Sequence, residues 1–464
     1  MSKFMGLLKN EYIKQLKKKS TLFIFILVAV FAFGLAGLVK LSLMIGGDID
    51  EIKEKFTSYD YSEDIDREKE AGNDDLVEYY TYLQDNKINR TNWKNDLATV
   101  MFNMGGDRNA VAYVATVGYE GDVKELYGGF IKNNDWKGYY EFLKTRTDDK
   151  DLIWGFDYRL DNNIAPEENS YADDADWRNS VLDSYIMNSI RAKNSFSEEQ
   201  KQGLKDEALT AKYRLENDVS VNIAGSSMTE MMSEQDGTYE SGGIEKQTLW
   251  TSFASSTSVV SFIGMLIIVI AGGIIASEFS NGTIKFLLIN PRTRGKILLS
   301  KYVTVISIGY IMMILCYIFS LISSIIFFGT SDMGAMYIKT SAGVTKAISG
   351  FTYIFEQYLL SSIYVVVMAT FAFAISSVVK SSSLAIGLGI FAMSMGENAV
   401  QILKMAFNVD AGRYTIFANA DLQTIAQGQT LFPGQTLGFA IAVIAIHLVV
   451  FLLTAWDGFV RRDI

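Results

Sequence analysis

The sequence has little proline, cysteine or histidine for its length. Three prolines, one cysteine and one histidine occur among 464 residues. A single cysteine, Cys316, cannot form an intrachain disulfide, so a large domain must be stabilised by ordinary packing. With His447 as the only histidine, a His/Cys zinc site and a Ser/His or Cys/His catalytic pair are not expected, and no metal site is predicted.

The sequence also lacks a phosphate-binding loop of the form G-x-x-x-x-G-K-[ST]. In many ATPases this loop cradles the nucleotide phosphates with backbone amides and a lysine. The chain is therefore not expected to be an enzyme by itself. If it acts as a pump, the ATPase is another polypeptide.

Charge is divided unevenly along the chain. Residues 46–250 contain 43 acidic and 23 basic residues, a net charge of −20, whereas the remainder contains 9 and 19, a net charge of +10. This division predicts an acidic, water-facing domain at 46–250 and a basic, membrane-embedded remainder. The acidic domain argues against nucleic acid as a partner. Its scarcity of helix breakers favours a mainly helical structure.

Six long apolar runs predict an α-helical polytopic membrane protein with six transmembrane helices. A span needs roughly 20 apolar residues. A cleavable signal peptide is the alternative for the first run, but that run is long, and Lys40 can snorkel at its outer end. The expected spans are 21–45, 256–277, 302–328, 354–379, 383–405 and 436–456.

Residues 1–20 are expected to form an amphipathic helix that contacts membrane lipid at the interface. Phe4, Leu8, Tyr12 and Leu16 recur every four residues, and the lysines lie largely off that stripe. The alternative is an unstructured basic anchor. Lys and Arg number 14 on the side of the N-terminus and 4 in the short loops opposite. This bias predicts that both termini, including the tail 457–464, are cytoplasmic in a bacterial plasma membrane.

Two passages in the acidic domain resemble each other. They read Y-R-L-D-N-N-I at 158–164 and Y-R-L-E-N-D-V at 213–219. Each follows a helical stretch, so they are expected to end two similar helical arms, with coincidence as the alternative.

The loop at 278–301 reads EFSNGTIKFLLINPRTRGKILLSK. Asn281 and Gly282 break the preceding span, a short amphipathic segment follows at 283–289, and Pro291 ends it. The cations that come next are typical of a cytoplasmic membrane surface. The loop is therefore expected to hold a short surface helix between two spans.

This string resembles the loop between spans two and three of type-2 ABC exporter permeases. That pattern has a glutamate, a Gly-Thr pair, a short apolar helix, a proline, arginines and a final lysine, which is Lys301 here. The resemblance implies a coupling helix that docks onto a separate ATP-binding subunit. Two such subunits would bind ATP and Mg²⁺, and this chain would bind no cofactor. The coupling residues that it implies are Glu278, Gly282, Thr283, Phe286, Leu287, Leu288, Pro291 and Arg294.

The same resemblance implies a second permease subunit, as a homodimer or heterodimer, and a path lined by spans two and five. Apolar walls suit the export of a hydrophobic or amphipathic cargo, such as a lipid-like molecule, a drug or an antimicrobial peptide. Glu397 has two interpretations: an ion pair with Lys404, seven residues on, or a contact for cargo. The candidate wall residues are Phe262, Met265, Leu266, Phe391, Met395, Glu397 and Asn398.

Two other classes of function stay open. One is a membrane-anchored receptor or sensor that binds a ligand through residues 46–250 without transport. The other is a secondary transporter, which usually has several intramembrane ionisable groups and inverted repeats. Such groups are sparse here, and the membrane part shows no evident repeat.

The charge bias gives a test of sidedness. A cysteine introduced at Asp135 is expected to react with an impermeant maleimide in whole cells, whereas one at Thr293 is not. The reverse labelling pattern would overturn the topology.

Overall fold

The computed structural model describes residues 2–45, 54–104, 111–169, 172, 175–195, 197–224, 248–283, 293–330, 334–379, 381–407, 410–426 and 430–461. The chain divides into two compact units, each assembled from separate stretches of sequence. The membrane unit comprises Met1–Lys40, Leu249–Ser331 and Phe351–Ile464. The polar unit comprises Leu41–Thr248 and Asp332–Gly350.

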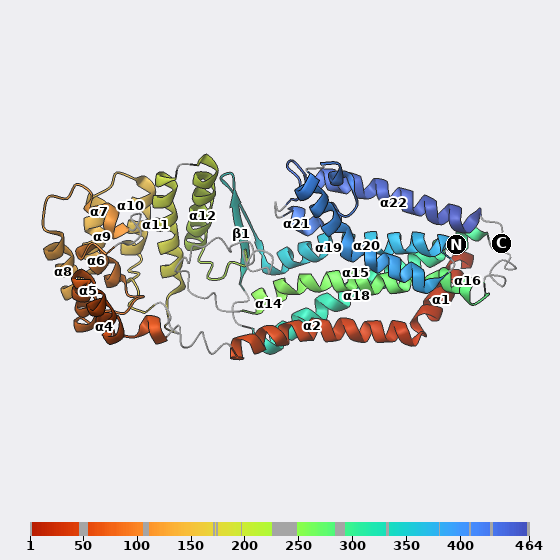
Figure 1. Cartoon of the computed structure of the whole chain (residues 1–464), viewed down its shortest axis with the longest axis horizontal. Helices are drawn as coiled ribbons and strands as arrows, with labels where there is room; N and C mark the ends of the chain where they lie inside the picture. The colour runs from red at the N-terminus through yellow and green to blue at the C-terminus, as the bar shows by residue number, and fades with distance from the viewer. Residues whose placement is uncertain are drawn as a thin grey trace. The chain divides into compact units, whose positions relative to one another are not determined.

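Within the described residues, six helices of the chain are long and apolar enough to cross a membrane (Figure 1). This confirms the expected set of six apolar helices. A shorter helix, α1 (Ser2–Leu16), precedes the first of them. The spans are Lys19–Leu41, Leu249–Ser280, Arg294–Phe328, Gly350–Val378, Ser382–Ala406 and Leu437–Val460.

The second span is interrupted by a tight 3₁₀ turn. Hydroxyl side chains at the turn bond to backbone carbonyls of the preceding residues: Ser255 Oγ donates to the Thr251 carbonyl (2.8 Å) and Ser256 Oγ to the Phe253 carbonyl (2.6 Å). Such bonds compete with the regular helical pattern and bend helices. The span consists of α14 (Leu249–Ser255), η1 (Ser256–Ser258), α15 (Val259–Ile274) and α16 (Ala276–Ser280).

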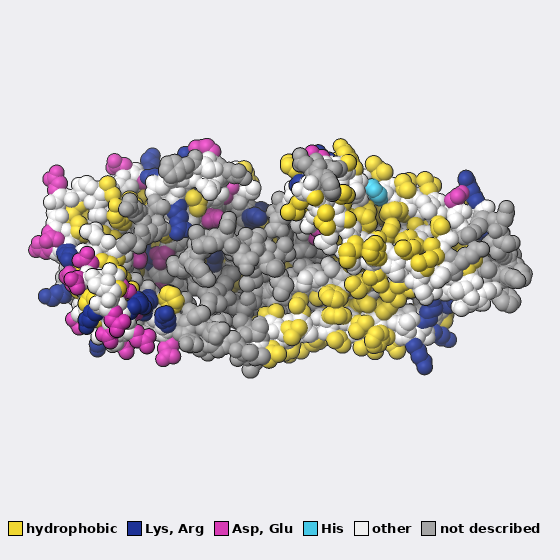
Figure 2. Space-filling model, in the orientation of Figure 1, with side chains coloured by type: hydrophobic (Ala, Val, Ile, Leu, Met, Phe, Trp, Pro, Cys, Tyr) yellow, Lys and Arg dark blue, Asp and Glu magenta, His cyan; other side chains and the backbone are white. Residues whose placement is uncertain are grey.

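Two of the other long helices, α18 (Arg294–Phe328) and α20 (Ser382–Phe407), pack directly against α15. A close approach occurs at Gly272, where an added Cβ would lie 3.2 Å from the Ile386 backbone nitrogen. Apolar side chains cover the face of the membrane unit seen in Figure 2, as expected for a surface in contact with lipid. The other long helices of this unit are α2 (Lys19–Ile45), α18 (Arg294–Phe328), α19 (Gly350–Val378), α20 (Ser382–Phe407) and α22 (Leu437–Val460), and its short helices include α21 (Leu422–Ala426) and η2 (Asp410–Tyr414).

The polar unit is mainly helical around an aromatic core. Buried tyrosines direct their hydroxyls to backbone carbonyls: Tyr61 donates to Ile88 (2.8 Å) and Tyr127 to Ala112 (2.6 Å). These bonds satisfy phenols that burial would otherwise leave unpaired. The helices are α4 (Ser62–Ala71), α5 (Asp74–Asp85), α6 (Trp93–Met101), α7 (Val111–Thr116), α8 (Val123–Asn133), α9 (Trp136–Thr145), α10 (Lys150–Asp161), α11 (Trp177–Asn194) and α12 (Glu198–Glu216).

The two similar passages do end two helices, α10 and α12, and a third copy ends α5. The third reads Y-L-Q-D-N-K-I at 82–88 and was not anticipated. In each copy the asparagine amide donates to the tyrosine carbonyl, the next residue is left-handed, and the last residue is buried. The asparagines are Asn86, Asn162 and Asn217; the left-handed residues are Lys87, Asn163 and Asp218; the buried residues are Ile88, Ile164 and Val219.

A β-hairpin between the third and fourth spans belongs to the polar unit and was also not anticipated. Its strands, β1 (Met336–Ser341) and β2 (Val344–Ser349), are antiparallel and joined by Ala342 and Gly343, both with positive φ. The Asp206 carboxylate on α12 accepts bonds from both turn amides (2.8 and 2.9 Å). The outer edge of β1 is bonded to Thr210 and to the Asn222 side chain. The hairpin is therefore fastened to α12 and the segment that follows it.

The left-handed lysine gives a test of the repeated helix end. A lysine at φ 51° carries a steric cost that glycine lacks. Lys87→Gly is expected to stabilise the α5 end by about 1 kcal/mol, so that hydrogen exchange of the Ile88 amide slows. Lys205→Gly, in the interior of α12, should speed local exchange because glycine destabilises helices. Faster exchange at Ile88 in Lys87→Gly would contradict the interpretation.

Candidate functional site

The described residues include both ends of the loop at 278–301 but not its middle. Glu278 lies in the last turn of the second span, and Gly282 has a positive φ of 69° that suits glycine. The third span begins at Arg294. Phe286, Leu287, Leu288 and Pro291 lie outside the described residues, so the coupling helix stays a prediction.

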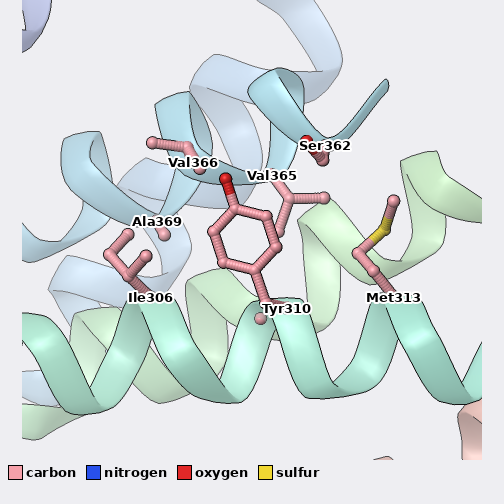
Figure 3. Close-up of a pocket in the computed structure, with 8 residues that line it drawn as sticks. Ile306, Tyr310, Met313, Ser362, Val365, Val366 and Ala369 are labelled. Carbon is pink, nitrogen blue, oxygen red and sulfur yellow. The ribbon is translucent and has the colours of Figure 1, made fainter. Parts of the chain in front are cut away.

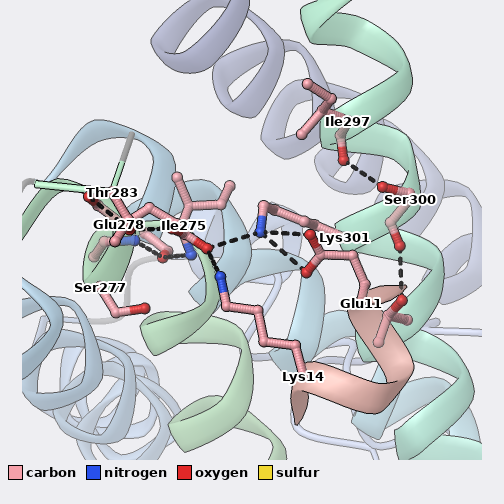
Figure 4. A network of polar contacts seen from close by, with 12 residues as sticks. Glu11, Lys14, Ile275, Ser277, Glu278, Thr283, Ile297, Ser300 and Lys301 are labelled. Carbon is pink, nitrogen blue, oxygen red and sulfur yellow. Dashed lines mark hydrogen bonds and ion pairs between the residues drawn. The ribbon is translucent and has the colours of Figure 1, made fainter. Parts of the chain in front are cut away.

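Lys301 is the centre of a buried ion network where the second and third spans meet α1. Its side chain is wholly buried. The ammonium donates to both carboxylate oxygens of Glu11 (2.9 and 3.0 Å) and to Oε1 of Glu278 (3.3 Å), as Figure 4 shows. Three elements, α1, α16 and α18, therefore meet at one cation.

Glu278 has further partners on both of its oxygens. Oε1 accepts a bond from the Lys14 ammonium on α1, and Oε2 accepts one from the Thr283 hydroxyl, at the start of the loop. The Glu278 side chain is 3% exposed, whereas that of Lys14 is 48% exposed. The network therefore extends from a buried carboxylate to the protein surface.

A network of this kind is sensitive to the loss of any one member. Removing ions from water costs several kcal/mol each, and good geometry with several partners is needed to offset that cost. Here a lysine with three short contacts and a glutamate with both oxygens occupied meet that condition. The arrangement fixes α1 against the entrance to the loop.

The sequence analysis placed Glu278, Thr283 and Lys301 in one motif but did not connect them to α1. The available signal was that Glu11 is the only acidic residue among the first 20. A single carboxylate within a lysine-rich interfacial helix is not needed for lipid contact, and it points to a partner inside the protein. Glu11 in fact lies on the face of α1 that packs against α18.

Arg294 lies at the other end of the loop. Its guanidinium donates to the Val460 carbonyl (3.4 Å) in the last turn of α22. A cation at a helix C-terminus interacts favourably with the free carbonyls there. The second end of the loop is therefore anchored to the last span.

The candidate wall residues lie on α15 and α20, which pack side by side. Phe262 stacks on Phe31 of α2, with ring centroids 4.4 Å apart, so its ring contacts the first span. Phe391 and Met395 are exposed. Glu397 accepts a bond from Gln401 (3.2 Å), and it and Asn398 are on the exposed side of α20. Met265 and Leu266 are half-buried on α15.

The ion pair suggested for Glu397 and Lys404 does not form. Lys404 donates to the Leu431 carbonyl, and its ammonium lies 5.0 Å from the centroid of the Phe432 ring. The spacing of seven residues does place both side chains near one face of α20, but the segment after the helix supplies a nearer acceptor for the lysine. Glu397 is left with a neutral partner.

The recesses in the described part of the membrane unit include a small one and one of about 530 Å³ that is lined by Val378, Leu453, Thr454, Asp457, Gly458 and Arg461. A recess between α18 and α19, lined by Ile306, Tyr310, Met313, Ser362 and Val366 among others, has about 10 Å³ of free space (Figure 3). That volume holds one water-sized group. Among the described residues, no group of three His, Cys, Asp or Glu side chains could hold a metal ion.

Comparison with known proteins places the second half of the chain in a family. The family described as "Protein of unknown function (DUF2705)" matches residues 224–464. The chain belongs to the DUF2705 family. The match contains Glu278, Thr283 and Lys301 but neither Glu11 nor Lys14.

Two relatives from Bacillus subtilis (strain 168) are similar over about half of the chain. "Uncharacterized protein YhcI" is 36% identical over 221 residues, which are 47% of this chain and 69% of the relative. "Uncharacterized membrane protein YdbK" is 31% identical over 216 residues, 46% of this chain and 82% of the relative. No solved structure matches. With its six long apolar helices, this DUF2705 chain is a multi-pass membrane protein.

The network predicts strong coupling between its members. Lys301→Met would leave the Glu11 and Glu278 carboxylates close together with too few cations, and it is expected to cost about 3–5 kcal/mol, measured as a lower melting temperature in detergent. Adding Glu11→Gln should recover much of the loss. Lys17→Met, an exposed control at the end of α1, should change little. Equal melting temperatures for Lys301→Met and wild type would contradict the network's role.

Proposed function

We propose that this chain is the membrane-spanning subunit of an ATP-driven exporter similar to the type-2 ABC permeases, working with two separate ATP-binding subunits. The observation that carries the proposal is the buried network around Lys301. It joins the first and last residues of the permease-like motif, Glu278 and Lys301, to each other and to α1. A loop that is pushed by a partner subunit must be attached to the spans by rigid contacts at its ends.

The proposed mechanism begins at the loop. ATP and Mg²⁺ bind to the partner subunits, whose closure pushes on residues 279–290. The Thr283 hydroxyl and the Glu278 carboxylate link that segment to Lys14 and Lys301. Because α1, α16 and α18 share these ions, the push would move these three helices as one body. The first three spans, which contain or adjoin them, would tilt as a result.

The cargo path is proposed to lie between two copies of the chain, or between this chain and a similar subunit. The recess between α18 and α19 is too small for cargo. The exposed side of α20 carries Phe391 and Met395 together with Glu397 and Asn398. A charged residue on the outer side of a span is costly against lipid and favourable beside a partner or a wet path. This mixture suits a hydrophobic or amphipathic cargo with one polar group.

Two other classes of function would use different parts of the chain. A receptor or sensor would use the polar unit and the same loop to contact a signalling partner without transport. A secondary transporter would need ion-coupling groups in the membrane, and Glu397 is a single candidate. A neighbouring reading frame with a phosphate-loop ATPase would favour the exporter over both.

Assembly with the ATPase provides the direct test. The full chain is expected to co-purify with its ATPase in detergent, and replacing Leu287 and Leu288 with Asp should abolish this association because the loop helix would lose its apolar face. Leu209→Asp with Val344→Asp, two exposed apolar positions on the polar unit, is the matched control and should keep the complex. Retention of the ATPase by the loop variant would sink the coupling assignment.

A further inference from the structure

The corner where α1 meets α2 has more positive charge than its acidic residues balance. Three lysines, Lys14, Lys18 and Lys301, surround two carboxylates, Glu11 and Glu278. The carboxylates are occupied by Lys14 and Lys301. Among the described residues, no carboxylate lies within ion-pair distance of Lys18, which is half-buried.

The surroundings of Lys18 disfavour its charge. Burial lowers the pKa of Lys18, and the nearby charges of Lys14 and Lys301 lower it further, against the weaker attraction of Glu278 and Glu11. An anion from outside the chain would stabilise a half-buried ammonium in this position.

The position of the α1–α2 corner and the residues on its surface indicate what kind of anion would bind Lys18. Lys18 directly precedes Lys19, the first residue of the first span. The side of α1 that does not pack on α18 exposes Met5, Ile13 and Leu16. Apolar side chains interleaved with lysines are typical of a helix that lies in the headgroup layer of an anionic membrane. Figure 2 shows basic side chains gathered where α1 meets α2.

We propose that the α1–α2 corner binds the phosphate headgroup of an anionic phospholipid, with Lys18 as the central contact and Lys14, Lys17 and Lys19 around it. The apolar residues of α1 place the helix at the depth where lipid phosphates lie. The headgroup balances the surplus charge and leaves Lys14 and Lys301 on Glu278. The lipid thus completes the ion network that fixes the two ends of the loop.

Lipid binding by the purified full chain tests this proposal without any ATPase. The lipid proposal can therefore fail while the transport assignment stands, and the transport assignment can fail while the lipid proposal stands. In nanodiscs of phosphatidylcholine mixed with phosphatidylglycerol, wild type is expected to retain phosphatidylglycerol preferentially and to melt at a higher temperature than in phosphatidylcholine alone. Lys18→Met should lower that retention about fivefold, the effect of one lysine near an anionic surface. Lys132→Met, an exposed lysine of the polar unit, is the control.

The melting temperatures of Lys18→Met distinguish a lipid contact from simple destabilisation. In phosphatidylcholine alone the variant should melt at or above the wild-type temperature, because the surplus charge is gone, and it should lose most of the gain from phosphatidylglycerol. The proposal would be overturned if phosphatidylglycerol raised the melting temperature of Lys18→Met as much as that of wild type. It would also be overturned if inorganic phosphate gave the same rise in phosphatidylcholine discs, or if Lys18→Met changed lipid retention only with the ATPase present.

Discussion

One buried ammonium, that of Lys301, holds together the end of the membrane unit at which the loop 278–301 begins and ends. It is wholly buried and shared between the Glu11 and Glu278 carboxylates. An ion in this position is stable only while its partners stay in place. As a result, the interfacial helix, the end of the second span and the start of the third span cannot move independently without a large cost.

This rigidity contrasts with the other end of the second span. There the 3₁₀ turn at Ser256–Ser258 separates α14 from α15, and Ser256 bonds to Tyr358 on α19 (2.8 Å). Hydroxyls that exchange between backbone and side-chain partners let a helix bend at modest cost. The second span therefore combines an end fixed by ions, near Glu278, with a 3₁₀ turn near its other end, at Ser256. In the proposed exporter, movement imposed at the loop would reach the cargo path through this bend.

Local patterns in the sequence were informative wherever the structure depends on local interactions. Apolar runs identified the six long helices, and the repeated passages at 158–164 and 213–219 identified two helix ends. The third copy at 82–88 escaped notice because Leu83 and Gln84 replace the Arg-Leu pair. Its function as a helix end depends on the tyrosine carbonyl and the asparagine amide, both of which it keeps, and on the left-handed conformation of the next residue.

Features that depend on distant contacts were missed or wrongly assigned. Glu11 meets Lys301 across 290 positions of sequence, and the hairpin at 336–349 pairs with α12 across more than 120. Lys404 prefers the Leu431 carbonyl to Glu397 because the chain folds back beside it after the helix. No periodicity within a single helix carries this information.

The division of the polar unit into two stretches has a mechanical consequence. The chain crosses between the two units four times, leading into or out of the first four spans. A domain inserted into a chain once is tied to the rest by two connections, whereas this one is tied by four. Moreover, β1 lies within the part of the chain that the DUF2705 family matches, while Thr210 and Asn222, which cover its edge, precede residue 224. A relative that shares only the matched part must shield that edge from strand-to-strand aggregation in some other way.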